Sequence, residues 1–462
     1  MYKIVKDMGE INRMEKENKM GVMPVNKLLI SMSAPIMISM LVQALYNVVD
    51  SIFVANLSEN ALTAVSLAFP AQNLIIAVAV GTCVGMNALL SKSLGEKNME
   101  KADRIAENGV FVMLMSYIVF LVMGIFLSRP FYYVQTGNAQ IAEDGIIYTT
   151  ICLTCSFGVF MQICFERTMQ ATGKTIYTMY TQGLGAIINI ILDPIFIFGL
   201  LGAPKMGVAG AAAATVIGQI CAAIVGFILN QKVNKEIKIT LKGIFKPDAR
   251  IIKEIYMIGI PSVIMQSIGS VMCFGMNKIL IKMTETAAAV FGAYFKLQSF
   301  VFMPVFGLNN GMIPILGYNY GARKADRIKK TIKLSIVYAI SFMAVGLVIM
   351  QLIPDKLLGF FNASEHMLSI GVPALRIISL SFVFAGYCIV LGSVFQAFGH
   401  AWLSMIVSIT RQIIVILPVA WALSLTGNVN AVWWSIPIAE IASLTLSTFF
   451  YIWLKKALIS KL

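Results

Sequence analysis

Charged side chains are scarce in this sequence. Only 13% of its 462 residues are Asp, Glu, Lys or Arg, whereas 58% are hydrophobic. A soluble domain of this size would need far more charge on its surface. The first 27 residues also lack the pattern of a cleaved signal peptide, because they carry charges of both signs and no small-residue cleavage site follows them. These absences predict a membrane protein whose first span is retained.

Histidine and cysteine are also rare, which limits the available chemistry. His366 and His400 are too few and too far apart for a metal site. The seven cysteines lie almost entirely in apolar segments, and the C-x-x-C pair Cys152 and Cys155 falls inside a predicted span. A redox or metal role would need an accessible thiolate in a polar setting, so we interpret this pair as packing. Because no constellation of nucleophile, base and metal ligands occurs, we expect neither an enzyme nor a cofactor.

What the sequence has in abundance is long stretches without a charged side chain. Each can hold at least one helix of about 20 residues, the length that a bilayer needs. They are residues 28–49, 60–91, 108–128, 145–165, 206–231, 255–277, 297–322, 334–354, 377–410 and 412–439. The segment around Asp193 and the apolar segment before Lys455 bring the total to twelve spans. We predict an all-α polytopic membrane protein with twelve transmembrane helices.

The two halves of the sequence repeat each other at a displacement of 226 residues, so that Pro35 recurs as Pro261 and Gln72 as Gln298. Six spans in each half leave both copies pointing the same way, which makes the repeat parallel, about an axis along the membrane normal. Many secondary transporters are built in this way, with the substrate path between the repeats. The predicted segments are a cytoplasmic tail at 1–27, a first lobe at 28–230, a basic cytoplasmic loop at 231–253, a second lobe at 254–454 and a cytoplasmic tail at 455–462.

The repeat also preserves two pairs of glycines. They are Gly81 and Gly85 of "GTCVG" and Gly307 and Gly311 of "GLNNG". Small residues let helix backbones approach closely inside a membrane. We therefore interpret both motifs as helix packing rather than as direct ligand contacts.

The net charge of +14 is best explained by topology rather than by nucleic-acid binding. With the N-terminus inside, most Lys and Arg residues fall in cytoplasmic tails and turns, above all at 231–253 and 323–333. Loops rich in Lys and Arg stay in the cytoplasm. We therefore place both termini in the cytoplasm and expect the lipid bilayer, not nucleic acid, as the partner.

Polar side chains inside the first, fifth and sixth spans follow helical spacing, which lays each set on one face that must avoid lipid. The sets are Gln43, Asn47 and Asp50; Gln182, Asn189 and Asp193; and Thr215 and Gln219. Ionisable residues in a membrane are costly and are functional candidates by default. Two carboxylates with amide and hydroxyl oxygens suit Na⁺ or a proton equally well. The sequence does not decide between these ions.

The second copy lacks both acids. Met276 stands at the position of Asp50, and the fifth-span comparison, shifted by two residues, sets Leu417 against Asp193. A purely architectural acid would have survived duplication about as well as the glycines did. We therefore interpret Asp50 and Asp193 as binding a coupling cation. The alternative is that each acid caps a loosened backbone or pairs with a basic residue.

The second half carries basic groups within its spans instead. Lys296 and Arg411 lie deep, where they could meet Glu440 in a structural ion pair or an anionic part of a ligand. Both alternatives remain open from the sequence. The candidates for lining a substrate cavity are Gln43, Asn47, Gln182, Gln219, Lys296 and Arg411.

Several segments, in this order, carry a family resemblance. "ALYNVVDSIFV", "NIILDPIFIFG", "GVAGAAAAT" and "FMPVFGLNNGMIPILGYNYGARKADR" resemble the multidrug and toxic compound extrusion (MATE) transporters, most closely their MepA-like bacterial branch. The resemblance implies two six-helix lobes arranged as a V in the bacterial plasma membrane. It implies export of cationic and aromatic drugs in exchange for Na⁺ or H⁺. It also implies a first-lobe cation site at Asp50, Asn189, Asp193 and Thr215.

Our hypothesis is therefore a monomeric multidrug antiporter that needs no cofactor beyond its coupling ion. One rival is a flippase for lipids or lipid-linked saccharides of the same superfamily. Such relatives usually have fourteen spans, and only twelve are found here. A non-transporting scaffold or sensor is a rival of another class, but it would need a sizeable soluble domain to signal through.

Overall fold

The computed structural model describes residues 18–361 and 363–461, which form helices and turns with no β-strand among them. The chain divides into two units. Unit 1 comprises residues up to Val22 together with Ile38–Val263, and unit 2 comprises Met23–Met37 and Ile264–Leu462. Two long helices, α3 (Val25–Ala55) and α11 (Ala249–Met283), contribute to both units.

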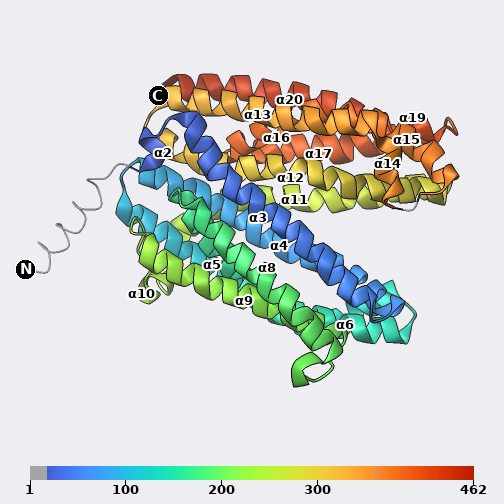
Figure 1. The fold of residues 1–462 in the computed structure, drawn as a ribbon. Coiled ribbons are helices and arrows are strands. Elements are labelled where there is room, and N and C mark those ends of the chain that lie inside the picture. The colour runs from blue at the N-terminus through green and yellow to red at the C-terminus, as the bar shows by residue number, and fades with distance from the viewer. Residues whose placement is uncertain (1–17, 362, 462) are drawn as a thin grey trace, which may run out of the picture. The chain divides into compact units, whose positions relative to one another are not determined.

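The other elements of unit 1 follow each other through short turns (Figure 1). They are α2 (Lys19–Val22), α4 (Glu59–Gly95), α5 (Met99–Gln135), α6 (Ala139–Thr154), α7 (Phe157–Ala171), α8 (Thr175–Phe198), the 3₁₀ turn η1 (Leu200–Gly202), α9 (Val208–Val233) and α10 (Leu241–Ile244).

Unit 2 has the same plan. Its other elements are α12 (Glu285–Gly321), α13 (Ala325–Leu352), α14 (Pro354–Gly359), α15 (Glu365–Ser379), α16 (Phe382–Ala397), α17 (Ala401–Ile409), the π-helical segment η2 (Thr410–Ile416), α18 (Leu417–Ser424), α19 (Val429–Val432), α20 (Ser435–Ala457) and the 3₁₀ turn η3 (Ile459–Lys461).

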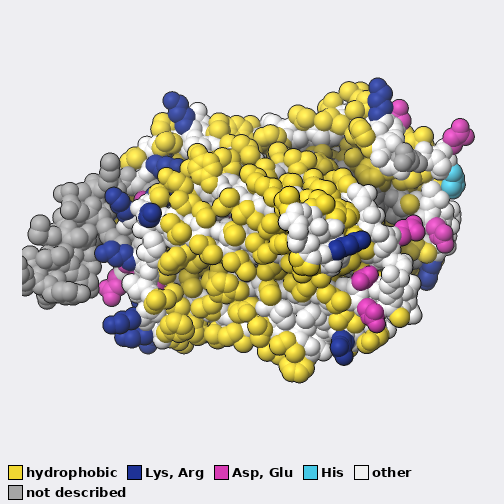
Figure 2. Space-filling model, turned by 60° about the horizontal axis from the view of Figure 1, so that its bottom comes forward, with side chains coloured by type: hydrophobic (Ala, Val, Ile, Leu, Met, Phe, Trp, Pro, Cys, Tyr) yellow, Lys and Arg dark blue, Asp and Glu magenta, His cyan; other side chains and the backbone are white. Residues whose placement is uncertain are grey.

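The helices confirm the predicted membrane fold. Within the described residues, ten helices are long and apolar enough to cross a membrane, and two bent pairs bring the number to twelve if each pair is one span. Large apolar side chains such as Phe126 and Phe274 are exposed, as lipid contact requires. On the face drawn in Figure 2, hydrophobic side chains cover the middle, and charged side chains gather toward the ends.

The two bent spans occupy corresponding places in the repeat. One bend of 43° separates α6 from α7, and the other, of 49°, separates α15 from α16. At each break a serine hydroxyl donates to the carbonyl three residues earlier, from Ser156 to Leu153 and from Ser381 to Ile378. A side chain that bonds to the local backbone in this way competes with the helical hydrogen bonds and favours a bend.

The glycine motifs pack helices closely, as the sequence predicts. In unit 1, a Cβ at Gly81 would lie 2.9 Å from the Cα of Val263 on α11. In unit 2, a Cβ at Gly311 would lie 3.0 Å from the Cα of Ser33 on α3. These contacts explain why the start of α11 belongs to unit 1 and the start of α3 to unit 2. The predicted lobes at 28–230 and 254–454 differ from the units in this respect, because most of each of these helices was assigned to a single lobe.

The basic segment after α9 is fastened to α5 by acidic side chains. Glu107 Oε1 accepts hydrogen bonds from the Thr240 hydroxyl at 2.6 Å and from its backbone N–H at 3.2 Å. Asp103 Oδ1 accepts from the Lys238 backbone N–H at 2.6 Å. The connection between the two repeats is therefore an ordered part of unit 1 rather than a loose linker.

Candidate functional site

The structure brings Asp50 and Asp193 together within unit 1. Each lies five residues before the end of its helix, Asp50 on α3 and Asp193 on α8. The two carboxyl groups are within hydrogen-bonding reach of each other, and Asp193 is fully buried. Asp50 Oδ1 is buried too and has no hydrogen-bond partner among the described residues. Two negative charges this close repel strongly, and a proton or small cation between them would remove the repulsion.

Asn189 and Thr215 extend the site from Asp193 onto α9. The Asn189 amide lies between Asp193 and Thr215. With its nitrogen toward Asp193, it donates to Oδ2 at 3.1 Å, and its oxygen accepts from the Thr215 hydroxyl at 3.2 Å. Carboxylate, amide and hydroxyl oxygens are the hard donors that a small cation such as Na⁺ prefers. The structure therefore gathers all four residues that the resemblance implied.

A close helix contact sets the spacing of this group. A Cβ at Gly218 on α9 would lie 2.7 Å from the carbonyl oxygen of Gly185 on α8. Asn189 follows Gly185 by one turn, and Thr215 precedes Gly218 by about one turn. Figure 1 shows α8 and α9 running side by side. The glycines thus bring the two backbones close enough for the short Asn189 and Thr215 side chains to meet.

Gly218→Ala is expected to destabilise the protein by about 1–3 kcal/mol, because the added methyl group pushes against the Gly185 backbone and must separate the helices. Thermal unfolding of the purified protein in detergent measures the effect. Gly183→Ala on α8 is the matched control, since a Cβ there meets nothing within 4 Å and the helix gains up to about 1 kcal/mol from alanine. Equal stability of the two variants would contradict the close-packing argument.

Uncharged polar groups surround the acid pair. Gln72 Nε2 on α4 donates to the Tyr148 hydroxyl on α6 at 2.9 Å. Tyr148 and Tyr46 both lie near the Asp50 carboxyl. These side chains can hydrogen-bond a carboxyl group or a hydrated ion but cannot neutralise it. The sequence noted Gln72 only as a repeat position and did not single out either tyrosine.

The predicted cavity-lining residues of unit 1 have different surroundings. Gln43 hydrogen-bonds Tyr46 and so borders the site. Asn47 has an exposed side chain on α3, and Gln219 is half-buried on α9 one turn beyond Thr215. Helical spacing thus placed these residues on polar faces, and among these three described residues Gln43 is the one that contacts a tyrosine beside the acid pair, Tyr46.

Gln182, the remaining candidate of this unit, meets another buried acid, which the sequence analysis missed. Glu166 on α7 is only 3% exposed. Gln182 Nε2 donates to Glu166 Oε2 at 2.8 Å, and Gln162 Nε2 and Thr181 Oγ1 each donate to Oε1 at 3.0 Å. Glu166 lies near the end of a span, and a charged residue at such a position is expected to belong to the exposed turn that follows. The one available signal was Gln162, one turn earlier on the same helix face.

The two basic candidates belong to unit 2. Arg411 Nη1 lies 2.8 Å from Glu440 Oε1, so the ion pair that the sequence left open is present. Lys296 Nζ lies 5.8 Å from the centroid of the Phe361 ring, a cation–π distance. Both basic candidates, Lys296 and Arg411, therefore contact side chains of their own unit.

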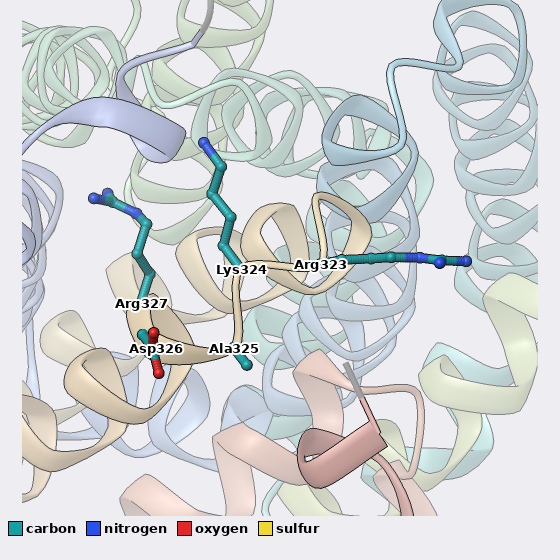
Figure 3. Close-up of a pocket in the computed structure, with 5 residues that line it drawn as sticks. All are labelled: Arg323, Lys324, Ala325, Asp326 and Arg327. Carbon is teal, nitrogen blue, oxygen red and sulfur yellow. The ribbon is translucent and has the colours of Figure 1, made fainter.

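A surface pocket at the turn between α12 and α13 is lined by Arg323, Lys324, Ala325, Asp326 and Arg327 (Figure 3). Lys324 and Arg327 extend to one side of the turn, and Arg323 points in another direction. Arg327 is held in place because its Nε donates to Asn319 Oδ1 at 3.0 Å. This basic lining disfavours a cation, so we assign the pocket no part in the candidate site.

Comparison with known sequences places both halves of the chain in one family. The MatE family model matches residues 35–195 and again residues 261–422. The multidrug export protein MepA of Staphylococcus haemolyticus is 27% identical over 428 residues, which covers 92% of each chain. MepA of Staphylococcus aureus is 26% identical over 419 residues, 90% of this chain and 91% of the relative.

Solved structures agree with the sequence comparison. The crystal structure of a MATE protein in complex with MaL6 matches with a TM-score of 0.88 and 25% identity, over 96% of this chain and 99% of that one. An outward-facing multidrug resistance MATE family transporter of the MOP superfamily matches with a TM-score of 0.87 and 25% identity, over 95% and 97%. Because the family model covers most of each repeat, this chain belongs to the MatE family of multidrug and toxic compound extrusion transporters.

Proposed function

We propose that this protein exports cationic and aromatic compounds across the bacterial plasma membrane in exchange for Na⁺ or H⁺. The observation that carries the proposal is the buried contact between Asp50 and Asp193, with Asn189 beside Asp193. The class of cargo is supported by the relatives, which are named multidrug export proteins.

The acid pair would act as an exchangeable cation site. The two carboxyl groups repel each other when both are ionised, so they gain most from a positive charge held between them. A proton bound to one carboxyl provides this charge, and so does Na⁺ bound by carboxylate, amide and hydroxyl oxygens. When the ion leaves, the repulsion returns. Occupancy of the site therefore changes the energy of unit 1 by a large amount.

This change couples ion binding to export. An ion can drive a conformational equilibrium only if it binds one state better than the other. A site whose two carboxyl groups come together in one state and separate in another meets this condition. A parallel repeat of two six-helix halves is an architecture in which such states expose a path to opposite sides of the membrane.

The proposal also fixes an orientation. The basic segments at 231–253 and 323–333 are assigned to the cytoplasm, together with both termini. Ions then enter the site from outside. A potential that is negative inside contributes about 2.3 kcal/mol per charge per 100 mV to cation entry.

Proteoliposomes test the proposal directly. Purified protein is reconstituted and supplied with a fluorescent cationic dye, and a Na⁺ gradient or a pH gradient is imposed separately at constant ionic strength. We expect the dye to be concentrated by one of the two gradients and not in protein-free vesicles. Accumulation that neither gradient drives would overturn cation-coupled export, whereas the gradient that succeeds identifies the coupling ion.

A further inference from the structure

Unit 2 carries a buried ion pair on the counterparts of α8 and α9, two of the three helices that form the candidate site of unit 1. The displacement of 226 residues carries the bounds of α8 onto Ala401–Ser424, the span formed by α17, η2 and α18. The same displacement places Glu440 of α20 at Ala214, next to Thr215. The fifth-span comparison, which is shifted by two residues, places Arg411 at Ile187, two residues before Asn189. The fifth and sixth spans of each repeat therefore hold a polar group at nearly the same level.

The pair is well sheltered from solvent. The side chain of Glu440 is 6% exposed and that of Arg411 is 23% exposed. Arg411 Nη1 donates to Glu440 Oε1 at 2.8 Å, whereas Glu440 Oε2 is buried and has no hydrogen-bond partner among the described residues. Arg411 lies in the π-helical segment η2, which packs against α20. π-Helical segments are rare in proteins, and those that do occur often lie at functional sites.

The other described groups that interact with the pair are uncharged side chains. Tyr294 comes from α12 and Cys388 from α16. The hydroxyl group of Ser443 is buried on α20, one turn beyond Glu440 and beside Cys388. Without Arg411, Glu440 would be a buried carboxylate with oxygen and sulfur groups around it and no counter-charge. Leaving one charge of a buried pair uncompensated is strongly destabilising.

The two units thus compensate buried carboxylates in different ways. In unit 1 the Asp50 and Asp193 carboxyl groups face each other, and the compensating charge must come from solution. In unit 2 a guanidinium, which keeps its charge at every accessible pH, is attached to the protein. We propose that the guanidinium group of Arg411 takes the place of the exchangeable cation in unit 2. Unit 2 then keeps a permanently occupied version of the site, and each chain exchanges ions only in unit 1. This inference rests on the proposed function of the acid pair.

A gain-of-function variant tests the inference. Arg411→Met removes the charge but keeps an unbranched side chain, and Glu440 is left free to recruit a cation from solution. The variant is made in a chain that also carries Asp50→Asn and Asp193→Asn, so that the site in unit 1 cannot respond. The midpoint of thermal unfolding in detergent is measured while Na⁺ replaces choline at constant ionic strength, and separately while the pH is lowered.

We expect Arg411→Met to lower the unfolding midpoint and to make it rise again with Na⁺ or with acid. Adding Glu440→Gln should raise the midpoint of the variant and remove this dependence, because no carboxylate then needs compensation. Arg376→Met on α15 is the matched control, since Arg376 is exposed and its loss creates no buried charge.

Three results would overturn the inference. The first is an Arg411→Met variant whose stability responds to neither Na⁺ nor acid. The second is a response that persists after Glu440→Gln. The third is failure of the protein to fold both with and without Glu440→Gln, which would make Arg411 a packing residue. Failure of the proposed function would show in a separate comparison. In that case Na⁺ or acid would stabilise the protein with intact Asp50 and Asp193 no more than the variant that carries Asp50→Asn and Asp193→Asn.

Discussion

Asp50→Asn is expected to abolish the accumulation of dye against its gradient while leaving the protein folded. Asparagine matches aspartate in size and can still hydrogen-bond Asp193, but it can neither hold nor release a positive charge. With one ion exchanged per dye cation, a roughly tenfold ion gradient supports about tenfold dye accumulation, since each factor of ten corresponds to about 1.4 kcal/mol. For the variant, the ratio of inside to outside dye should fall to that of protein-free vesicles. Fluorescence of the dye in proteoliposomes measures this ratio.

The same experiment has an internal test of whether the two acids act as one site. Asp193→Asn should lose accumulation as completely as Asp50→Asn does. The double variant should be no worse than either single one, because residues of one site are not additive. Asp144→Asn on α6 makes the same chemical change in unit 1 at a partly exposed position and should leave accumulation intact. Full gradient-driven accumulation by Asp50→Asn would remove this residue from the coupling mechanism.

The sequence predicted the fold well because the bilayer makes its physical signals strong. A chain inside a membrane must satisfy its backbone within helices, so charge-free stretches translate directly into spans. The repeat supplied the division into halves. What it could not supply was the exchange of the first parts of α3 and α11 between the units, since that depends on which helix meets Gly81 and which meets Gly311.

The candidate site was partly predictable for a similar reason. Asp50, Asn189 and Asp193 could be selected because an acid in an apolar helix is rare, and because the second copy of the repeat lacks both aspartates. Contacts between helices leave no such pattern. The hydrogen bond from Gln72 to Tyr148 joins residues 76 positions apart, and nothing in either helix alone indicates its partner.

The contacts of Glu166 were likewise not predictable from the sequence. They also differ from those of Asp50, another acid of unit 1. Asp50 has a buried oxygen that no described residue hydrogen-bonds, so this oxygen can accept an interaction from an ion. Both oxygens of Glu166 accept hydrogen bonds, from side chains on α7 and α8. A carboxyl group that accepts hydrogen bonds from two helices holds those helices against each other. The first arrangement suits exchange, and the second suits stability.

Glu166→Ala is therefore expected to be among the most destabilising single substitutions in unit 1. It removes the acceptor of Gln162, Thr181 and Gln182 together, and each buried polar group left unpaired costs about 1–3 kcal/mol. The Thr181 hydroxyl can still donate to the Thr178 carbonyl at 2.9 Å, so the two amides carry most of the loss. We expect a decrease of about 3 kcal/mol in the free energy of unfolding, measured by denaturant or thermal unfolding in detergent.

Two further variants separate the hydrogen bonds from other effects of the substitution. Glu166→Gln keeps the size of the side chain and one carbonyl acceptor, so its stability should lie between those of the unmodified protein and Glu166→Ala. Glu143→Ala removes an exposed glutamate of α6 and should change the unfolding free energy by less than about 0.5 kcal/mol. If Glu166→Ala proved no less stable than Glu143→Ala, the hydrogen bonds to Glu166 would contribute nothing to holding α7 against α8.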